Sequence, residues 1–548
     1  MVQLDLIVMA VFAALILAIG MAFTRMGSKN SQSFFEAGGE TPWWINGLSL
    51  FISYFSAGTF VVWGSIAYKA GFVANGIQLT MVFGGLLVAW FIAKKWKRTG
   101  ALTAAEYIGK RFNTPTQQFY TFLIMLHGLF TTASVLYPVG KMVQVASPLS
   151  LEACIIIIGG IIVLYTSAGG LWAVLVTDVV QFVILTCAVL IVIPMAFTEI
   201  NGVSGFVQNA PQGFFNFTND DFPIGFLLAF MLYQTAYIGG NWAYVQRYTS
   251  VSSEKNAQKV AYLFTGLYFI SPFIWMLPPM IYRIINPNLV GLEPEGAYMM
   301  LCQKILPAGL IGLVLAGMIS ATASKANTTI NLVATVFAND VYTKIQPEAS
   351  EKTLILVARI FTVFFGGLTI WIAILVPKVG GIVEMVLSTA SIAGGALFVP
   401  IIWSLYSKRP TASTVVTASL TGLIISLFLK IGAPSVLGFK LSRTMETALG
   451  VGLPLLVMVL FELYYYFNQK TANFSLESLQ NRESSHNHDD ADEQNRFGVK
   501  VILSSITFVG FGIALLGCFA DRGETAIIVG ILTTMGGGFG VWKTRQVA

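Results

Sequence analysis

The residues best suited to do chemistry lie in the stretch 321–331, Ala-Thr-Ala-Ser-Lys-Ala-Asn-Thr-Thr-Ile-Asn, where small and hydroxylated side chains interrupt a hydrophobic segment. In a helix, Ser324, Thr328 and Asn331 would share one face, and Lys325 would lie beside it. Hydrocarbon offers hydroxyl groups no hydrogen-bond partner, so this face must look at protein, water or an ion. A charge at membrane depth costs at least about 2.5–3.5 kcal/mol on insertion scales, which makes Lys325 a functional candidate.

Two carboxylates also lie in hydrophobic segments. Asp178 stands near the start of an apolar run, with only Thr177 and Gln181 as polar neighbours within a turn. A buried carboxylate needs a cation or hydrogen-bond donors, so we expect Asp178 to have a partner. Glu384 is a second intramembrane carboxylate, and the sequence leaves open whether it faces a cavity.

The composition identifies the elements that must position these residues. Of 548 residues, 55% are hydrophobic and 11% are charged, which predicts an all-helical, polytopic membrane protein. Because a span needs about 20 mainly apolar residues, we predict about fifteen transmembrane helices. They lie near 4–24, 44–67, 76–95, 119–146, 151–168, 174–197, 222–245, 257–283, 305–338, 353–377, 380–406, 412–430, 444–467, 499–519 and 525–543. The first run has no basic start or cleavage site, so we expect a retained helix and not a signal peptide.

Basic residues predict the orientation in the membrane. With the amino terminus outside, Lys and Arg fall on the inner side in nearly every loop, and the connection at 199–221 carries neither. We therefore predict a multi-pass protein of a bacterial inner (plasma) membrane, with a cytoplasmic carboxyl terminus. The bilayer and a small solute are the expected partners. The basic residues are too dispersed for nucleic-acid binding, and no obligatory protein partner is indicated.

Cysteine and histidine spacing indicates no disulfide or metal set. The four cysteines are isolated, and the histidines form no ligand cluster with them. They are Cys154, Cys187, Cys302 and Cys518, with His127, His486 and His488. Weak metal binding by the histidines and aspartates near 484–494 stays an alternative.

Two spans share a pattern that predicts a repeat. Polar residues and glycines interrupt the helix at 53–59 and again at 233–241, five spans later. Interrupted helices in corresponding positions indicate an inverted repeat with a substrate site near mid-membrane. We predict six regions: an N-terminal flanking helix and loop at 1–42, repeats at 43–206 and 207–410, two flanking helices at 411–468, a hydrophilic cytoplasmic linker at 469–498 and a C-terminal helical hairpin at 499–548.

Six short motifs in order resemble the sodium:solute symporter family. They are Phe34-Phe-Glu-Ala-Gly-Gly39, Phe55-Ser-Ala-Gly-Thr-Phe60, Ala105-Glu-Tyr-Ile-Gly-Lys-Arg-Phe112, Ala168-Gly-Gly-Leu-Trp-Ala-Val-Leu-Val-Thr-Asp-Val-Val-Gln181, Val245-Gln-Arg-Tyr248 and Asn339-Asp-Val-Tyr342. The resemblance covers about residues 30–430. It implies a ten-helix, five-plus-five inverted-repeat core of the LeuT type with flanking helices, working by alternating access.

The resemblance also implies cation and solute sites. In the family a sodium ion lies between the second and ninth helices, which here places donors at Ile52, Phe55, Ala321, Ser324 and Lys325. A further sodium in some members would correspond to Asp178, Asn327 and Thr328. The implied substrate positions are Gly58, Thr59, Gln234, Tyr237 and Asn241, with Tyr237 closing over the solute from the inner side. Gly58 lacks the polar side chain of related sugar transporters, which argues against a simple hexose.

Lys325 departs from the implied hydroxyl ligand. An ammonium could place its charge where sodium would sit and pair with Asp178, so one hypothesis is that Lys325 is a tethered substitute for the ion. Transport would then be uncoupled from sodium at that site or coupled to a proton. In the alternative, Lys325 points into a water-filled vestibule and sodium still binds nearby.

The predicted function is a secondary active, sodium-coupled symporter of a small polar organic solute, such as a sugar derivative, sugar acid or amino acid. A sodium-independent transporter and a transporter-like solute sensor are the alternatives. No paired carboxylates, zinc-ligand spacing or Ser/Lys dyad indicates an enzyme. The sequence does not identify the solute, the stoichiometry or the oligomeric state.

Overall fold

The computed structural model describes residues 2–27, 41–101, 103–165, 171–337, 350–469, 488–520 and 523–546, with Tyr342 and Gln346. All regular elements in these ranges are helices. Three sets of residues from the sequence argument lie outside the described part: the motif at 34–39, most of the motif at 339–342, and the side chains of Thr328 and Asn331.

Eleven helices among the described residues are long and apolar enough to cross a membrane, judged by length and composition. Four shorter apolar helices accompany them: Gln3–Ile16, Trp43–Ile52, Leu151–Leu164 and Ile224–Gly240. The fold is therefore a polytopic helical bundle, as predicted, while the count of about fifteen spans stays a prediction.

The first predicted repeat contains ten helical elements. They are α3 (Trp43–Ile52), η1 (Thr59–Trp63), α4 (Gly64–Ala70), α5 (Val73–Leu87), η2 (Val88–Ile92), α6 (Ala93–Arg98), α7 (Ala104–Arg111), α8 (Thr114–Ala146), α9 (Leu151–Tyr165) and α10 (Leu171–Thr198). Helix α7 contains most of the motif at 105–112, and the hydroxyl of Thr103 caps it by accepting a hydrogen bond from the Glu106 amide.

Helix α11 (Gly202–Asn209) spans the predicted boundary between the repeats. The described elements of the second predicted repeat are α12 (Ile224–Gly240), α13 (Trp242–Thr249), α14 (Glu254–Trp275), α15 (Leu277–Ile285), η3 (Glu293–Gly296), α16 (Ala297–Ile305), α17 (Leu310–Val336), α19 (Glu351–Leu375), η5 (Val376–Val379), α20 (Ile382–Thr389), η6 (Ala390–Gly394) and α21 (Gly395–Ser404). The bounds of the repeats themselves stay predictions.

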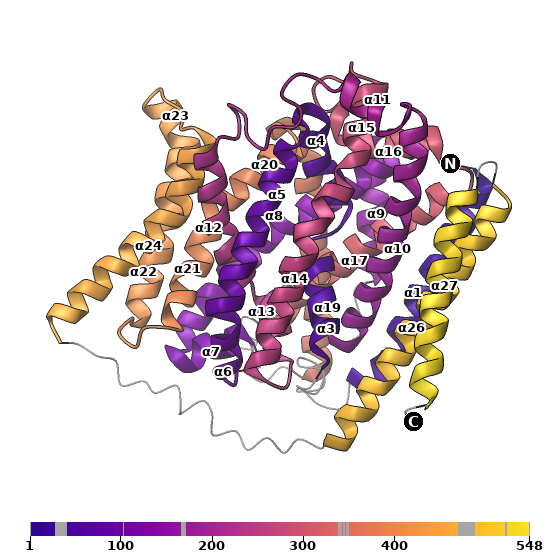
Figure 1. Ribbon diagram of the computed structural model, residues 1–548. Coiled ribbons are helices and arrows are strands. Elements are labelled where there is room, and N and C mark those ends of the chain that lie inside the picture. The colour runs from indigo at the N-terminus through magenta and orange to yellow at the C-terminus, as the bar shows by residue number, and fades with distance from the viewer. Residues whose placement is uncertain are drawn as a thin grey trace.

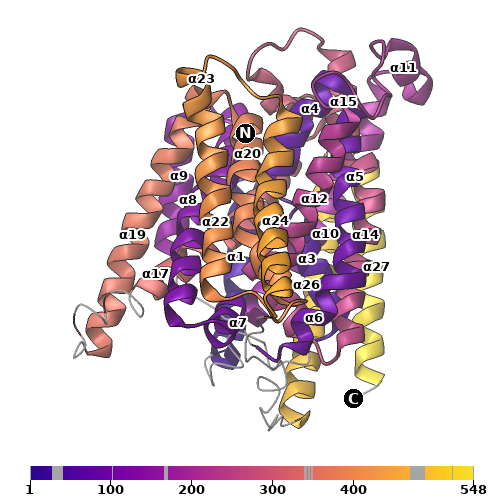
Figure 2. The ribbon, with the colours of Figure 1, turned by 90° about the vertical axis from the view of Figure 1, so that its left-hand side faces the viewer.

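Flanking helices cover two opposite sides of this core (Figure 1). On one side lie α22 (Ala412–Leu427), η7 (Phe428–Gly432), α23 (Ala433–Val436) and α24 (Arg443–Phe467). On the other side lie α1 (Gln3–Gly27) and the hairpin of α26 (His488–Cys518) and α27 (Glu524–Gln546). Figure 2 shows the same separation after a quarter turn, with α22 and α24 in front of the core and α27 behind it.

Both predicted helix interruptions are present. Helix α3 ends at Ile52 in a turn in which the Phe55 amide donates to the Ile52 carbonyl at 2.9 Å. Helical structure resumes at Ala57 and continues as the π-helix η1 from Thr59. Helix α12 ends at Gly240, and the Asn241 side chain caps α13 by accepting from the Ala243 amide at 3.0 Å. A Cβ atom at Gly240 would lie 2.7 Å from the Phe398 Cβ atom, so glycine permits the close approach of α21.

The C-terminal region differs from the prediction. We predicted a linker at 469–498 and a hairpin from 499, but α26 already begins at His488. Residues 470–487 lie outside the described part of the chain. The charged residues of 488–497 therefore extend a helix, because the hydrophobic pattern marks where an apolar span starts and not where its helix starts.

Candidate functional site

A cavity of about 120 Å³ lies between the two interrupted helices. Six helical segments supply its walls. They contribute Tyr54, Ser56, Gly58, Thr59, Val62 and Trp63 from the first interrupted helix, Met81 from α5, His127, Thr131, Ser134 and Val135 from α8, Phe230, Tyr233, Gln234 and Tyr237 from α12, Lys325 from α17, and Val386, Thr389 and Ala390 from α20 and η6. A concave site of this kind, at the interface of predicted repeats, is where a solute is expected to bind.

Several buried polar atoms of the cavity wall have no hydrogen-bond partner among the described residues. They are the Tyr54 hydroxyl, both ring nitrogens of His127 and the Gln234 Oε1 atom. The side chains of His127 and Gln234 are only 8% and 2% exposed. Because buried polar groups are nearly always hydrogen-bonded, these atoms indicate contact with a ligand or with water.

Aromatic side chains surround Tyr237 at the cavity. Its ring stacks on Tyr233 at a centroid distance of 5.6 Å and meets Phe398 edge-on at the same distance. The rings of Tyr54 and His127 lie 6.0 and 6.4 Å away, again edge-on. Edge-to-face and offset-stacked pairs at these distances stabilise one another, so Tyr237 belongs to a packed aromatic wall.

Four of the five predicted substrate residues line the cavity: Gly58, Thr59, Gln234 and Tyr237. The fifth, Asn241, is not among the lining residues, because its side chain is engaged as the cap of α13. Whether any of the five binds a solute stays a prediction.

The sequence argument missed the contribution of α8. His127, Thr131 and Ser134 all line the cavity. Their spacing of i, i+4 and i+7 places them on one helix face, and this spacing was a readable signal. Polar residues on such a face also serve ordinary helix packing in membranes, so the spacing alone does not separate the two roles.

Asp178 is the centre of a buried polar cluster that includes Ser49 of α3, close to the start of the first interruption. Its Oδ2 atom accepts a hydrogen bond from the Ser49 hydroxyl at 2.6 Å and lies 3.6 Å from the Arg247 Nη2 atom. The Ser324 hydroxyl donates to its Oδ1 atom at 3.4 Å. Arg247 also donates to Ser49 at 3.2 Å and to the Ala243 carbonyl at 2.6 Å. The cluster thus joins α3, α10, α13 and α17.

Lys325 does not pair with Asp178, contrary to the hypothesis. Its side chain lines the cavity instead, and no described residue forms an ion pair or hydrogen bond with its ammonium group. The cation beside Asp178 is Arg247. The predicted pairing is wrong because Arg247, more than sixty residues away along the chain, already supplies the charge beside Asp178. The substitution of Lys325 for the ion stays a prediction.

Only some of the remaining predicted cation donors contact one another. Ser324 of the first predicted site and Asp178 of the second share a hydrogen bond. The Ile52 carbonyl accepts from the Phe55 amide within the interruption, Ala321 is buried, and Asn327 is half-buried. The side chain of Thr328 lies outside the described part. The residues present fit a cation only in part, since an ammonium stands where one hydroxyl ligand is implied.

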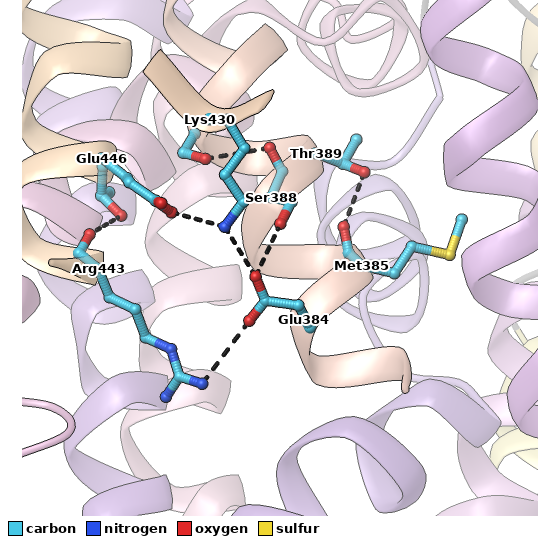
Figure 3. Close-up of polar contacts among 9 residues, drawn as sticks. Glu384, Met385, Ser388, Thr389, Lys430, Arg443 and Glu446 are labelled. Carbon is cyan, nitrogen blue, oxygen red and sulfur yellow. Dashed lines mark hydrogen bonds and ion pairs between the residues drawn. The ribbon is translucent and has the colours of Figure 1, made fainter. Parts of the chain in front are cut away.

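Glu384 is not among the residues that line the cavity, and its carboxylate points into an ion cluster with the flanking helices (Figure 3). Its Oε1 atom lies 2.7 Å from the Lys430 Nζ atom, and its Oε2 atom lies 3.7 Å from Arg443. Lys430 also contacts Glu446 at 2.8 Å. The cluster ties α20, which contributes Val386 and Thr389 to the cavity, to η7 and α24.

Comparison with known proteins places this geometry in a family. A profile of the sodium:solute symporter family matches residues 34–422, more than half of the chain. The chain belongs to this family. It is 25% identical to sodium/glucose cotransporter 2 of Rattus norvegicus over 473 residues, covering 77% of this chain and 71% of that protein. It is 26% identical to sodium/myo-inositol cotransporter 2 of Homo sapiens over 465 residues, covering 77% and 69%.

The fold is also similar to a solved structure. A Na+-coupled sialic acid symporter in its substrate-bound, outward-open state aligns with a TM-score of 0.68 and 22% identity, over 84% of this chain and 98% of that chain. The predicted family and the LeuT-like helical fold are therefore confirmed. The chain is an integral multi-pass membrane protein and a solute transporter, not an enzyme.

Proposed function

We propose that this chain is a secondary active transporter that carries a small polar organic solute together with sodium by alternating access. A sugar derivative, a sugar acid or an amino acid would match the polar groups of the site. One observation carries the proposal: the cavity between the interrupted helices presents buried, unpartnered polar atoms from several helices. Family membership supports sodium as the driving ion.

The proposed solute residues are Gly58, Thr59, Gln234 and Tyr237, to which the geometry adds His127. Asn241 is proposed to act through the helix break that it caps. The proposed sodium donors are the carbonyls of Ile52, Phe55 and Ala321 with the Ser324 hydroxyl. A further cation is proposed at Asp178, Asn327 and Thr328.

The cluster around Asp178 supports a conformational role. It joins α3 and α13, the halves of the two interrupted helices that lie toward the α7 end of the bundle, to α10 and α17. Opening the bundle at that end would separate α3 or α13 from α10. The Arg247–Asp178 contact must then break, so this contact would favour a state closed at the α7 end.

A specific observation favours a second candidate, transport without sodium at the first predicted site. Lys325 stands in place of an implied hydroxyl ligand, and Arg247 already contacts Asp178. Each of two expected cation positions therefore has a protein cation on or beside it. Coupling would then be to a proton or absent.

Thermal stability of the purified protein separates the two candidates. The protein is held in potassium buffer and titrated with sodium, with lithium as the control for ionic strength. A ligand that binds the folded state raises its stability by mass action. Saturable, sodium-specific stabilisation supports symport. The sodium-independent candidate is supported if sodium does not stabilise the folded wild type but does stabilise Lys325→Ser.

A further inference from the structure

The central cavity carries a positive charge that no described residue of the protein balances. The Lys325 side chain lines it, and the residues that line it include no aspartate or glutamate in the described part of the chain. Removing an ammonium group from water is costly unless an opposite charge and hydrogen bonds replace the lost hydration. The cavity therefore favours an anion beside Lys325, and the described residues that line it do not supply one.

The buried carboxylates are all engaged elsewhere. Three lie buried among the described residues: Asp5, Asp178 and Glu295. Asp5 accepts from the amides of two glycines at the start of α17, and Glu295 accepts from the Tyr137 hydroxyl at 2.6 Å and from the Ile382 amide at 3.0 Å. Asp178 contacts Arg247. None of them is left to neutralise Lys325.

The unpartnered atoms near Lys325 describe the rest of the ligand. The Gln234 Oε1 atom can only accept a hydrogen bond, the Tyr54 hydroxyl can donate and accept, and neutral His127 offers one donor and one acceptor. Acceptors of this kind match hydroxyl or amine donors. The cavity thus combines one cation with several neutral hydrogen-bonding groups.

We propose that the transported solute is a small organic acid with hydroxyl groups, and that its carboxylate binds the Lys325 ammonium. This inference rests on the proposed transport function and names the solute class for the same site. It assigns Lys325 to the solute and not to the coupling ion. Gln234, His127 and Tyr54 would bind the hydroxyl groups.

Matched neutral and acidic solutes test the assignment. The full-length protein in detergent is titrated with glycerol and D-glycerate, D-glucose and D-glucuronate, and D-galactose and D-galacturonate. Sodium is held constant, sodium chloride controls for the salt of each acid, and thermal stabilisation is recorded. Lys325→Met removes the charge, and Lys69→Met is the control, because Lys69 is an exposed lysine on α4.

We expect wild type and Lys69→Met to be stabilised by at least one acid at concentrations well below those of its neutral partner. Charge-assisted hydrogen bonds predict that Lys325→Met weakens the acid about 10- to 100-fold and leaves the neutral compound unchanged. Compared with Lys325→Met, Lys325→Arg should regain part of the preference for the acid. A lysine with a purely structural role would not determine this preference.

Three results would overturn the inference: equal or better stabilisation by the neutral partners, an acid preference that survives in Lys325→Met, or no stabilisation of the folded wild type by any acid. Stabilisation by a neutral sugar and by sodium would overturn only the acidic solute class. The proposed transport function would stand in that case, so the two failures are distinguishable.

Discussion

Replacing Arg247 with glutamine would leave Asp178 as a buried carboxylate with only hydroxyl donors. The two side chains are 4% and 7% exposed, and their closest atoms lie 3.6 Å apart. The Ser49 and Ser324 hydroxyls would remain near the carboxylate, but neither carries a charge. Removing one partner of a buried ion pair costs about 3–5 kcal/mol, because the other charge stays buried without compensation.

The chain offers a matched control at its surface. Arg98 and Glu254 form a bidentate ion pair, with distances of 3.0 Å from Nε to Oε1 and 2.7 Å from Nη2 to Oε2. Their side chains are 42% and 39% exposed. Exposed pairs contribute only about 0–1 kcal/mol, since water and salt screen them. Arg98→Gln should therefore change stability far less than Arg247→Gln, although its ion pair has the better geometry.

Thermal unfolding of detergent-solubilised variants in potassium buffer measures the difference. We expect a much lower unfolding midpoint for Arg247→Gln than for Arg98→Gln. Adding Asp178→Asn to Arg247→Gln should recover much of the loss, because the double variant no longer buries an unpaired charge. The reasoning is refuted if the two single variants lose equal stability, or if the double variant is less stable than Arg247→Gln.

Three further predictions follow from local geometry. Gly450→Ala should lower the free energy of unfolding by about 1–3 kcal/mol, because the new Cβ atom would clash with the Ser391 carbonyl oxygen of η6. Gly452→Ala, which has open space, should not, and unfolding midpoints compare the two variants. Lys430→Met removes the cation between Glu384 and Glu446 in a partly exposed cluster and should lower the free energy of unfolding by about 1–3 kcal/mol. The surface variant Lys69→Met should lose less stability in the same assay. Tyr237→Ala should weaken solute stabilisation more than Tyr237→Phe, which retains the ring contacts; equal effects would contradict this.

The helix interruptions were predictable because their signal is local. Glycines and polar residues in apolar spans near Ser53 and Asn241 are unfavourable in a continuous membrane helix, so the break follows from sequence. The cavity wall from α12 followed from the same pattern. The start of α26 at His488 was not predictable, since charged residues are compatible with either a linker or the exposed end of a helix.

The partners of buried charges depend on packing, and that is where sequence reasoning failed. Asp178 needed a cation, and both Lys325 and Arg247 were available in the sequence. Arg247 lies in the motif at the end of the second interrupted helix, and its guanidinium reaches Ser49, Asp178 and the Ala243 carbonyl together. A flexible lysine stem can direct its charge to either side of α17. Only the tertiary arrangement decides between the two cations.

The position of Lys325 beside Ser324 makes solute and sodium binding interdependent if both proposals hold. Like charges in a partly buried site repel, so sodium at the Ser324 site would bind weakly beside an unneutralised ammonium. A bound carboxylate offsets that repulsion and should raise sodium affinity by a factor typical of coupled sites, roughly 5- to 150-fold.

Linkage requires sodium to raise the affinity of the acid by the same factor. Sodium titrations with and without D-glucuronate, in wild type and in Lys325→Met, measure the coupling. We expect Lys325→Met to bind sodium with an affinity that no longer depends on the acid, because the repulsion that the acid relieves is gone. An equal dependence in both proteins would show that the coupling does not pass through Lys325.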